Sequence, residues 1–143
     1  MPWHPLVVHF AVALLPASAV TDLAALLFRR PPWHRVAFAL LVAGALGAVA
    51  AVLTGNAAAA PHRESETVAA LVAHHENLGT LSLFAFLTIC LGRLPLELQA
   101  RRGGWPLRAW IGAAVAANAL LWLAGHAGAE LVYGHGLGWP AGP

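Results

Sequence analysis

The sequence predicts an all-α integral membrane protein in which residues 1–143 form one four-helix bundle. Three observations support this prediction. Hydrophobic residues make up 59% of the chain and charged residues only 10%, whereas about a quarter of the residues in a soluble domain are charged. Four apolar segments each reach the roughly 20 residues that a helix needs to cross a bilayer core. The arginines gather in two of the three connections, which predicts an orientation.

The first apolar segment runs from about residue 5 to residue 28. Pro5 suits the first turn of a helix, where its missing N–H has no cost, and the run Arg29-Arg30-Pro31-Pro32 ends the segment. No basic region precedes the segment, which is too long for the apolar core of a signal peptide. We therefore expect it to remain in the membrane as a helix.

The second segment runs from about residue 36 to residue 58 and carries small residues on one helical face. Gly44, Ala48, Ala51 and Gly55 recur at helical spacing. Small residues on one face let two membrane helices approach closely. This stripe therefore predicts a tight contact with a neighbouring helix.

The third segment is expected at about residues 68–94 and the fourth at about residues 105–133. The start of the third segment is only half apolar, so we expect it to project from the hydrocarbon. We assign Arg93 to the basic connection that follows. Gly134 is expected to break the fourth helix.

The arginine distribution predicts the orientation of the bundle. Only Arg63 lies in the second–third connection, whereas the other seven arginines lie in or beside the other two connections. Because cytoplasmic connections are the basic ones, we expect an up-down-up-down bundle with both termini on the non-cytoplasmic side of a bacterial inner membrane. The seven arginines are Arg29, Arg30, Arg35, Arg93, Arg101, Arg102 and Arg108.

With this orientation, all the histidines except His34 fall at the non-cytoplasmic end. An imidazole within a membrane segment is costly, so it marks a candidate functional site. His9 lies one turn inside the first segment, and His75 precedes Gly79 on one helical face. The histidines at the non-cytoplasmic end are His4, His9, His62, His74, His75, His126 and His135.

Histidines of this kind favour a bound cofactor. Two neutral imidazoles from facing helices are the usual axial ligands of a b-type haem. Copper or zinc would use the same histidines, with Glu76 and Glu130 as further ligands, and the spacing leaves both interpretations open. The candidate ligands are His9 and His75 as the first pair, with His126 and His135 as a second pair or as hydrogen-bonding supports.

The same residues also have structural interpretations. We expect His4, His62 and His74 to lie at the membrane interface, and His9 has the alternative of a hydrogen bond to a neighbouring helix. The Gly and Ala stripes are more often packing surfaces than cofactor pockets.

Asp22 is the only carboxylate in the first segment. We expect it to pair with Arg29 or Arg30, or with Ser18 on its own helical face. Cys90 is the only cysteine, which excludes an intramolecular disulfide.

The two ends of the chain carry distinctive runs of residues. The first is His4-Pro5-Leu6-Val7-Val8-His9-Phe10, followed by Ala13-Leu14-Leu15-Pro16 and Asp22. The last is Gly128-Ala129-Glu130-Leu131-Val132-Tyr133-Gly134-His135-Gly136-Leu137-Gly138. Between them lie Thr54-Gly55 and His75 with Gly79.

Together these runs resemble domain-of-unknown-function family 2231, a bacterial family of predicted four-helix membrane proteins, over essentially the whole chain. The sequence departs at Ala129, where the family often has a second glycine, and at the adjacent His74-His75 pair. The resemblance implies a small inner-membrane protein with no settled activity. Some relatives are joined to cytochrome c-like or redox domains, which favours electron transfer over transport. The positions that match the family motifs are His4, His9, His75, Glu130, Tyr133 and His135.

The functional hypothesis is a membrane-embedded b-type haem protein that passes electrons from a quinol or a cytochrome to an acceptor outside the cytoplasm. The alternatives are a copper- or zinc-binding protein that uses the same histidines and a structural small subunit of a larger membrane complex; a larger respiratory complex is also a candidate partner. The sequence contains no nucleophile–base pair, phosphate loop or carboxylate dyad, so we expect no independent catalytic activity. A net charge of +2 gives no reason to expect nucleic acid, and the expected surroundings are membrane lipid.

Overall fold

The computed structural model describes residues 3–101 and 103–137, so Arg102 and Gly138 of the sequence argument lie outside the described residues. Within these ranges the chain forms four long α-helices and a short 3-10 helix, with no strand. Each α-helix is long and apolar enough to cross a membrane. The predicted all-α chain with four potential membrane spans is therefore confirmed. The elements are α1 (Trp3–Leu27), α2 (Trp33–Ala59), η1 (Ala60–His62), α3 (Ala69–Leu98) and α4 (Gly104–Tyr133).

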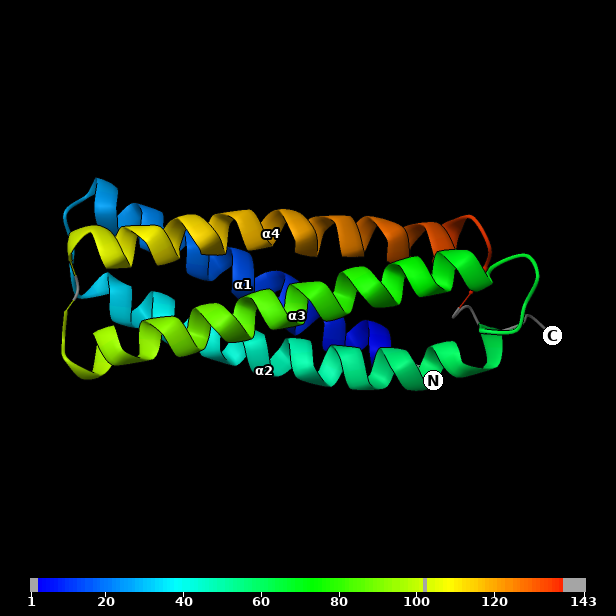
Figure 1. Cartoon of the computed structure of the whole chain (residues 1–143). Helices are drawn as coiled ribbons and strands as arrows, with labels where there is room; N and C mark the ends of the chain where they lie inside the picture. The colour runs from blue at the N-terminus through cyan, green and yellow to red at the C-terminus, as the bar shows by residue number, and fades with distance from the viewer. Residues whose placement is uncertain (1–2, 102, 138–143) are drawn as a thin grey trace.

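The four helices lie alongside one another (Figure 1). The α1–α2 and α3–α4 connections lie together at one end, which we call the arginine end because it holds Arg29, Arg30 and Arg101. The α2–α3 connection lies at the opposite end with the start of α1 and the end of α4. We call this the histidine end, because it holds His4 and His75.

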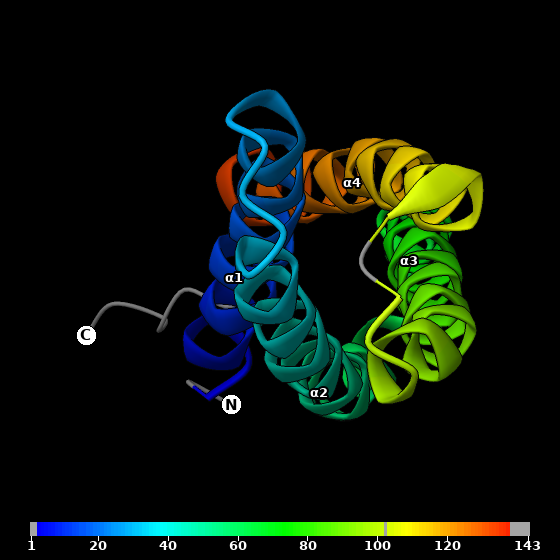
Figure 2. The same ribbon diagram turned by 90° about the vertical axis from the view of Figure 1, so that its left-hand side faces the viewer.

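Viewed along their length, the helices occupy the corners of a four-sided bundle (Figure 2). The contacts are most extensive between α1 and α2 and next between α3 and α4, and they are fewer between α2 and α3 and between α1 and α4. The bundle is therefore best described as two helical hairpins packed against each other.

Small residues explain why α1 and α2 pack so closely. A Cβ added at Gly44 would lie 2.7 Å from Cδ2 of Leu15, and one added at Gly47 would lie 3.3 Å from the backbone nitrogen of Ala11. The small-residue face of α2 thus packs against α1, as the spacing of Gly44 and Ala48 predicted.

The assignment of Arg93 to a connection is wrong. α3 continues past the predicted end at residue 94 and includes both Arg93 and Pro95. A proline in the last turn removes one backbone hydrogen bond, but the helix continues to the next stop signal. That signal is Ala100, which has a positive φ of 53° and completes a Schellman motif. In this motif the N–H of Arg101 donates to Leu96 O at 2.8 Å.

A buried core separates the two ends of the bundle. Leu15, Leu41 and Phe86 are each no more than 1% exposed and belong to one cluster. On its own helix, each of these three residues lies between a polar residue nearer the histidine end and a polar residue nearer the arginine end. Along α3 the two ends are about 27 Å apart, as judged from the helical rise between His75 and Arg93. The polar groups of the two ends therefore form two separate sites.

Candidate functional site

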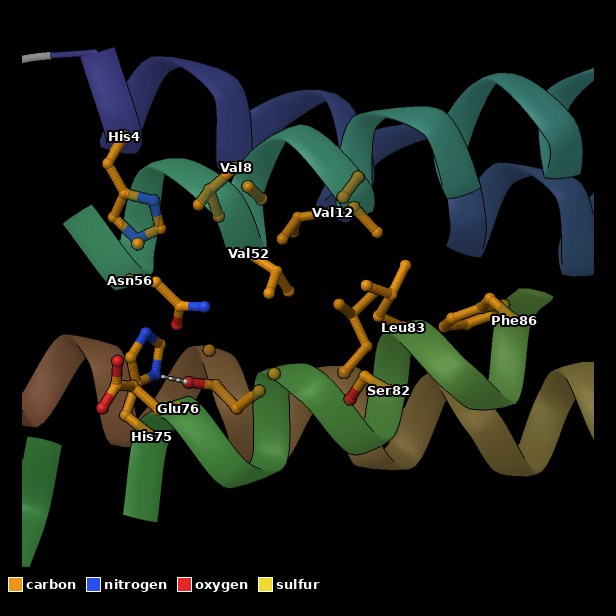
Figure 3. Close-up of a pocket in the computed structure, with 18 residues that line it drawn as sticks. His4, Val8, Val12, Val52, Asn56, His75, Glu76, Ser82, Leu83 and Phe86 are labelled. Carbon is orange, nitrogen blue, oxygen red and sulfur yellow. Dashed lines mark hydrogen bonds between the residues drawn. The ribbon is translucent and has the colours of Figure 1, made fainter. Parts of the chain in front are cut away.

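His4 and His75 face each other across a cavity at the histidine end (Figure 3). Their ring centroids are 6.4 Å apart, and the ring planes are inclined by 77°. An edge-to-face ring pair has the same geometry, so spacing alone does not assign a role. The protonation of the two rings carries more information.

Both rings use Nδ1 for a hydrogen bond that fixes the tautomer. The Nδ1 of His75 lies 2.9 Å from the backbone oxygen of Ala124, which can only accept. The Nδ1 of His4 lies 3.1 Å from the hydroxyl oxygen of Thr54. Thr54 donates its single hydrogen to Ala50 O at 2.8 Å, so toward His4 it also acts as an acceptor. Each neutral ring therefore carries its proton on Nδ1 and presents a lone pair on Nε2.

Two glycines allow the rings to take these positions. A Cβ added at Gly55 would lie 2.9 Å from Cε1 of His4, and one added at Gly128 would lie 2.9 Å from Cε1 of His75. Each ring is thus packed against the backbone of the neighbouring helix in its own hairpin. The α1–α2 hairpin supplies one ring and the α3–α4 hairpin supplies the other.

The cavity between the rings is small and mostly apolar. Its volume is about 90 Å³. In Figure 3 it extends from the two histidines along the seam between the hairpins toward Phe86. Gly79 is one of the residues that line the cavity, and a Cβ added there would meet no atom within 4 Å. Its apolar wall includes Val8, Val12, Val52 and Leu83.

Asn56 and Glu76 line the same cavity beside the histidine pair (Figure 3). The guanidinium of Arg63, from the α2–α3 connection, donates to Glu76 Oε1 at 2.6 Å and to Asn56 O at 3.4 Å. The hydrogen bond to Glu76, together with the charge of that carboxylate, raises the pKa of Arg63. The Arg63 guanidinium therefore lies beside two of the residues that line the cavity.

The structure does not bring the four predicted ligands together. His9 is exposed and donates from Nδ1 to Pro5 O of its own helix, so it does not face His75. The physical reason is helical register, because residues five positions apart point in directions about 140° apart. With His4 and Val8 facing the cavity, His9 must face outward.

His126 and His135 are also away from the cavity. His126 is exposed and stacks on Trp122 of the same helix, with 5.9 Å between ring centroids. His135 is exposed in the turn after α4. His4, which was expected at the membrane interface, instead takes the position expected of His9.

The donor set at the histidine end limits the ligands that it could hold. In residues 3–101 and 103–137, no three His, Cys, Asp or Glu side chains gather as a metal site built from protein ligands alone would need. Zinc sites normally have three or four such ligands. The two imidazoles therefore suit a metal that a bound cofactor already coordinates, or a metal ion that needs few ligands.

A second polar cluster, which was not predicted from the sequence, lies at the arginine end. Arg93 and Asp22 are fully buried, form an ion pair and belong to α3 and α1. His34 of α2 donates from Nδ1 to Asp22 Oδ1 at 2.7 Å. The expected pairing of Asp22 with Arg29, Arg30 or Ser18 is therefore wrong.

The remaining contacts of this cluster extend it across three helices. Arg93 also donates to the backbone oxygen of His34 at 3.4 Å, and its guanidinium lies 5.5 Å from the ring centroid of Phe38. Ser18 donates its hydroxyl hydrogen to the backbone oxygen of Ala37 at 2.8 Å, which explains why it does not donate to Asp22. One sequence signal pointed to Arg93, because Ser82, Phe86 and Ile89 precede it at core spacing on the same face of α3.

The sequence model of one protein family, described as predicted membrane protein (DUF2231), matches residues 1–140. The chain belongs to this family. The resemblance inferred from the two end runs is thereby confirmed. The comparisons found no matching curated protein and no matching solved structure. The family defines a membrane protein of unknown function, so any function of this DUF2231 protein must be argued from its sites.

Proposed function

We propose that this DUF2231 protein binds a b-type haem between His4 and His75 and transfers electrons in the membrane. The proposal keeps the cofactor expected from the sequence and changes one ligand, with His4 in place of His9. The observation that carries it is that His4 and His75, from two hairpins, face one mostly apolar cavity while Nδ1 of each ring is held by a hydrogen bond, which leaves Nε2 as the nitrogen for a ligand.

The spacing of the two rings supports a metal centre between them. A bond from a first-row metal to an imidazole nitrogen is about 2 Å long, so two such bonds in line place the ring centroids about 6 Å apart. The observed separation is 6.4 Å. Without a bound group, the two imidazole acceptor nitrogens face a mostly apolar cavity that they share with the side chains of Asn56 and Glu76, and an acceptor left without a donor there is unfavourable.

Haem fits this donor set better than zinc does. The macrocycle supplies four nitrogen ligands, so that two protein ligands complete the coordination of its iron. The present cavity is smaller than a macrocycle, so loading requires the hairpins to part at their seam. That seam is the weaker contact in the bundle, and the small residues Gly79 and Gly125 line it.

When bound, haem supplies a one-electron redox centre. The chain's own residues set its surroundings. Thr54 and the Ala124 carbonyl hold the two imidazoles in the Nδ1–H tautomer and fix their orientation, as supports of metal ligands do. Val8, Val52 and Leu83 keep the site apolar and limit the entry of water.

The arginines support an orientation for this site. With Arg93 buried in α3, six arginines remain in or near the connections of the arginine end and Arg63 alone lies at the other. This asymmetry favours an up-down-up-down bundle with the arginine end in the cytoplasm and both termini on the outer side of a bacterial inner membrane. The histidine site would then lie near the outer leaflet. Its electron partners would be a membrane quinol, a cytochrome or a larger respiratory complex.

The test is a reduced-minus-oxidised absorption spectrum of protein purified in detergent from haem-producing cells. We expect a b-type spectrum that is lost in both His4→Ala and His75→Ala and retained in His9→Ala and His126→Ala. Circular dichroism of each variant checks that the helices remain. Wild-type protein without a haem spectrum, or an unchanged spectrum in both cavity variants, would contradict the proposal.

A cuprous ion is the second candidate, because the same 6.4 Å spacing suits two imidazoles and one metal, without enlarging the cavity of about 90 Å³. Imidazole is a common copper ligand, and cuprous ions accept low coordination numbers. Elemental analysis of the purified protein separates this candidate from haem. Copper that is bound in the wild type and lost in His4→Ala, without a haem spectrum, would replace the first proposal.

A further inference from the structure

A groove lies between α2 and α3 at the arginine end of the bundle. The two helices occupy neighbouring corners of the bundle (Figure 2), and they contact each other less than the two helices of each hairpin do. The groove has a volume of about 540 Å³, several times that of the histidine cavity. Among the described residues that line it, Arg35 of α2 and Glu97 of α3 are charged and the others are apolar.

The apolar part of the groove matches one leaflet of a membrane. Val42, Leu46 and Leu98 line it and are exposed, so in a chain whose four helices can cross a membrane they face lipid. From Arg35 to Leu46 the groove runs about 16 Å along α2, as judged from the helical rise. The hydrocarbon core of a bilayer is about 30 Å thick, so one leaflet contributes about half of that length. The groove therefore has the length of the acyl chains of one lipid.

Arg35 and Glu97 place opposite charges at the same end of this groove. Arg35 lies in the first turn of α2 and Glu97 in the last turn of α3, so both lie at the arginine end and on opposite walls. A guanidinium binds phosphate oxygens, and a carboxylate accepts hydrogen bonds from an ammonium group. The pair is therefore complementary to a lipid headgroup that carries both a phosphate and an ammonium.

The buried guanidinium of Arg93 connects the two walls of the groove. It lies 5.5 Å from the ring centroid of Phe38 on the α2 wall, and its Nη2 lies 3.5 Å from Oε1 of Glu97 on the α3 wall. Arg93 is itself fully buried, so it supports the walls without facing the groove. A carboxylate accepts several hydrogen bonds, so Glu97 can bind Arg93 and an ammonium together. The groove is thus preformed, which lowers the cost of binding a ligand.

We propose that this groove binds one phosphatidylethanolamine molecule. The phosphate binds Arg35, the ammonium donates to Glu97, and an acyl chain lies along Val42 and Leu46. A choline headgroup carries the same charges but has no N–H to donate, and a glycerol headgroup has no positive charge. The site is therefore selective for a primary ammonium. This inference does not depend on the cofactor proposed at the histidine end.

The experiment is native mass spectrometry of the protein, purified and delipidated in detergent. It is titrated separately with phosphatidylethanolamine, phosphatidylcholine and phosphatidylglycerol of identical acyl chains. The variants are Glu97→Gln, Arg35→Gln and Ala43→Phe, which fills the groove. Arg108→Gln and Ala116→Phe are the matched controls, because these exposed residues of α4 have the same helical spacing as Arg35 and Ala43. Circular dichroism checks that the helices of each variant remain.

We expect the wild type to bind one phosphatidylethanolamine about tenfold more tightly than phosphatidylcholine, since one charge-assisted hydrogen bond has about that effect on affinity. Glu97→Gln should remove this preference and leave the binding of phosphatidylcholine unchanged. Arg35→Gln should weaken both lipids about fivefold, because both carry the phosphate. Ala43→Phe should remove the binding of all three lipids, and the two controls should match the wild type.

Three results would overturn the inference. Equal affinity of the wild type for phosphatidylethanolamine and phosphatidylcholine would show that no ammonium is recognised. Tighter binding of phosphatidylglycerol than of phosphatidylethanolamine would show that the arginines attract anionic lipids instead. An equal loss in Arg108→Gln and Arg35→Gln would assign the effect to surface charge in general. Each of these results leaves the haem spectrum untouched, so failure of this inference is distinguishable from failure of the proposed function.

Discussion

Arg93 and Asp22 are 71 residues apart in the sequence and form an ion pair in which both side chains are fully buried. The pair joins α3 to α1, two helices that carry no sequence signal of mutual contact. His34 adds a third helix through its hydrogen bond to the same carboxylate. The arginine end is thus held together by charged groups inside a segment that would otherwise be apolar.

Breaking this pair should destabilise the protein strongly. In Asp22→Asn the charge of Arg93 loses its fully buried partner and keeps only the longer contact with Glu97, at 3.5 Å; breaking a buried ion pair costs about 3–5 kcal/mol. We expect a comparable loss in Arg93→Met, which leaves Asp22 charged beside His34. Thermal unfolding in detergent, followed by circular dichroism, measures both effects.

A matched double variant tests whether charge imbalance is the cause. Asp22→Leu combined with Arg93→Met removes both charges, so it should recover most of the stability lost in either single variant. Arg35→Gln changes an exposed arginine at the same end and should have no measurable effect. Single variants as stable as the wild type would show that the pair contributes nothing.

A second prediction concerns the contact of Gly92 with Trp110, which joins α3 to α4. A Cβ added at Gly92 would overlap the indole ring of Trp110, whereas one added at Gly112 would meet open space. Gly92→Ala should therefore lower stability by about 1–3 kcal/mol through overpacking. Gly112→Ala should be neutral or slightly stabilising, because alanine favours the helix. Equal unfolding temperatures for the two variants would argue against a tight α3–α4 seam.

The helices were largely predictable because their signals are local. The signals are the length of each apolar segment, the run Arg29–Pro32 that ends α1, and the small residues Gly44 and Ala48. Each of them acts within one helix or one pair of helices. His75 was also identified, since Gly79 on its face indicated open space. These features depend on neighbouring residues in the chain and therefore appear in the sequence.

The choice between His4 and His9 was not predictable, for a physical reason. α1 is apolar on all sides, so no polar face shows which side turns toward the bundle. Arg93 was misplaced because a charged residue is normally excluded from the membrane. Its buried position depends on Asp22, a partner on a distant helix that spacing along α3 does not reveal.

A third prediction concerns Ala100, which adopts a left-handed conformation with φ of 53° at the end of α3. This conformation costs an L-residue with a Cβ about 1–2 kcal/mol. Ala100→Gly should relieve that strain, and after about 0.4–1 kcal/mol of added unfolded-state entropy a net gain of about 0.5–1 kcal/mol remains.

The same substitution inside a helix should act in the opposite direction. Ala119 is exposed within α4, so Ala119→Gly should cost about 1 kcal/mol of helix stability. Denaturant titrations of both variants measure whether each substitution raises or lowers the free energy of unfolding. A loss of stability in Ala100→Gly would mean that the Schellman ending does not persist in solution.

The last prediction concerns Thr54, whose hydroxyl oxygen accepts from Nδ1 of His4. Thr54→Val keeps the shape of the side chain but removes the acceptor that fixes the tautomer of His4. Loss of such a support weakens metal ligation by about 10- to 100-fold. We expect haem titration to show this loss, with the apoprotein unfolding at nearly the wild-type temperature.

Thr21 provides the matched control for Thr54. Its hydroxyl donates to Ala17 O of its own helix at 2.7 Å, as the hydroxyl of Thr54 donates to Ala50 O. Thr21→Val therefore loses the same intrahelical bond but touches neither histidine of the cavity. If the two valine variants bind haem with equal affinity, the effect of Thr54 is on the helix and not on the orientation of His4. A weaker affinity in Thr54→Val alone assigns Thr54 to the support of the imidazole.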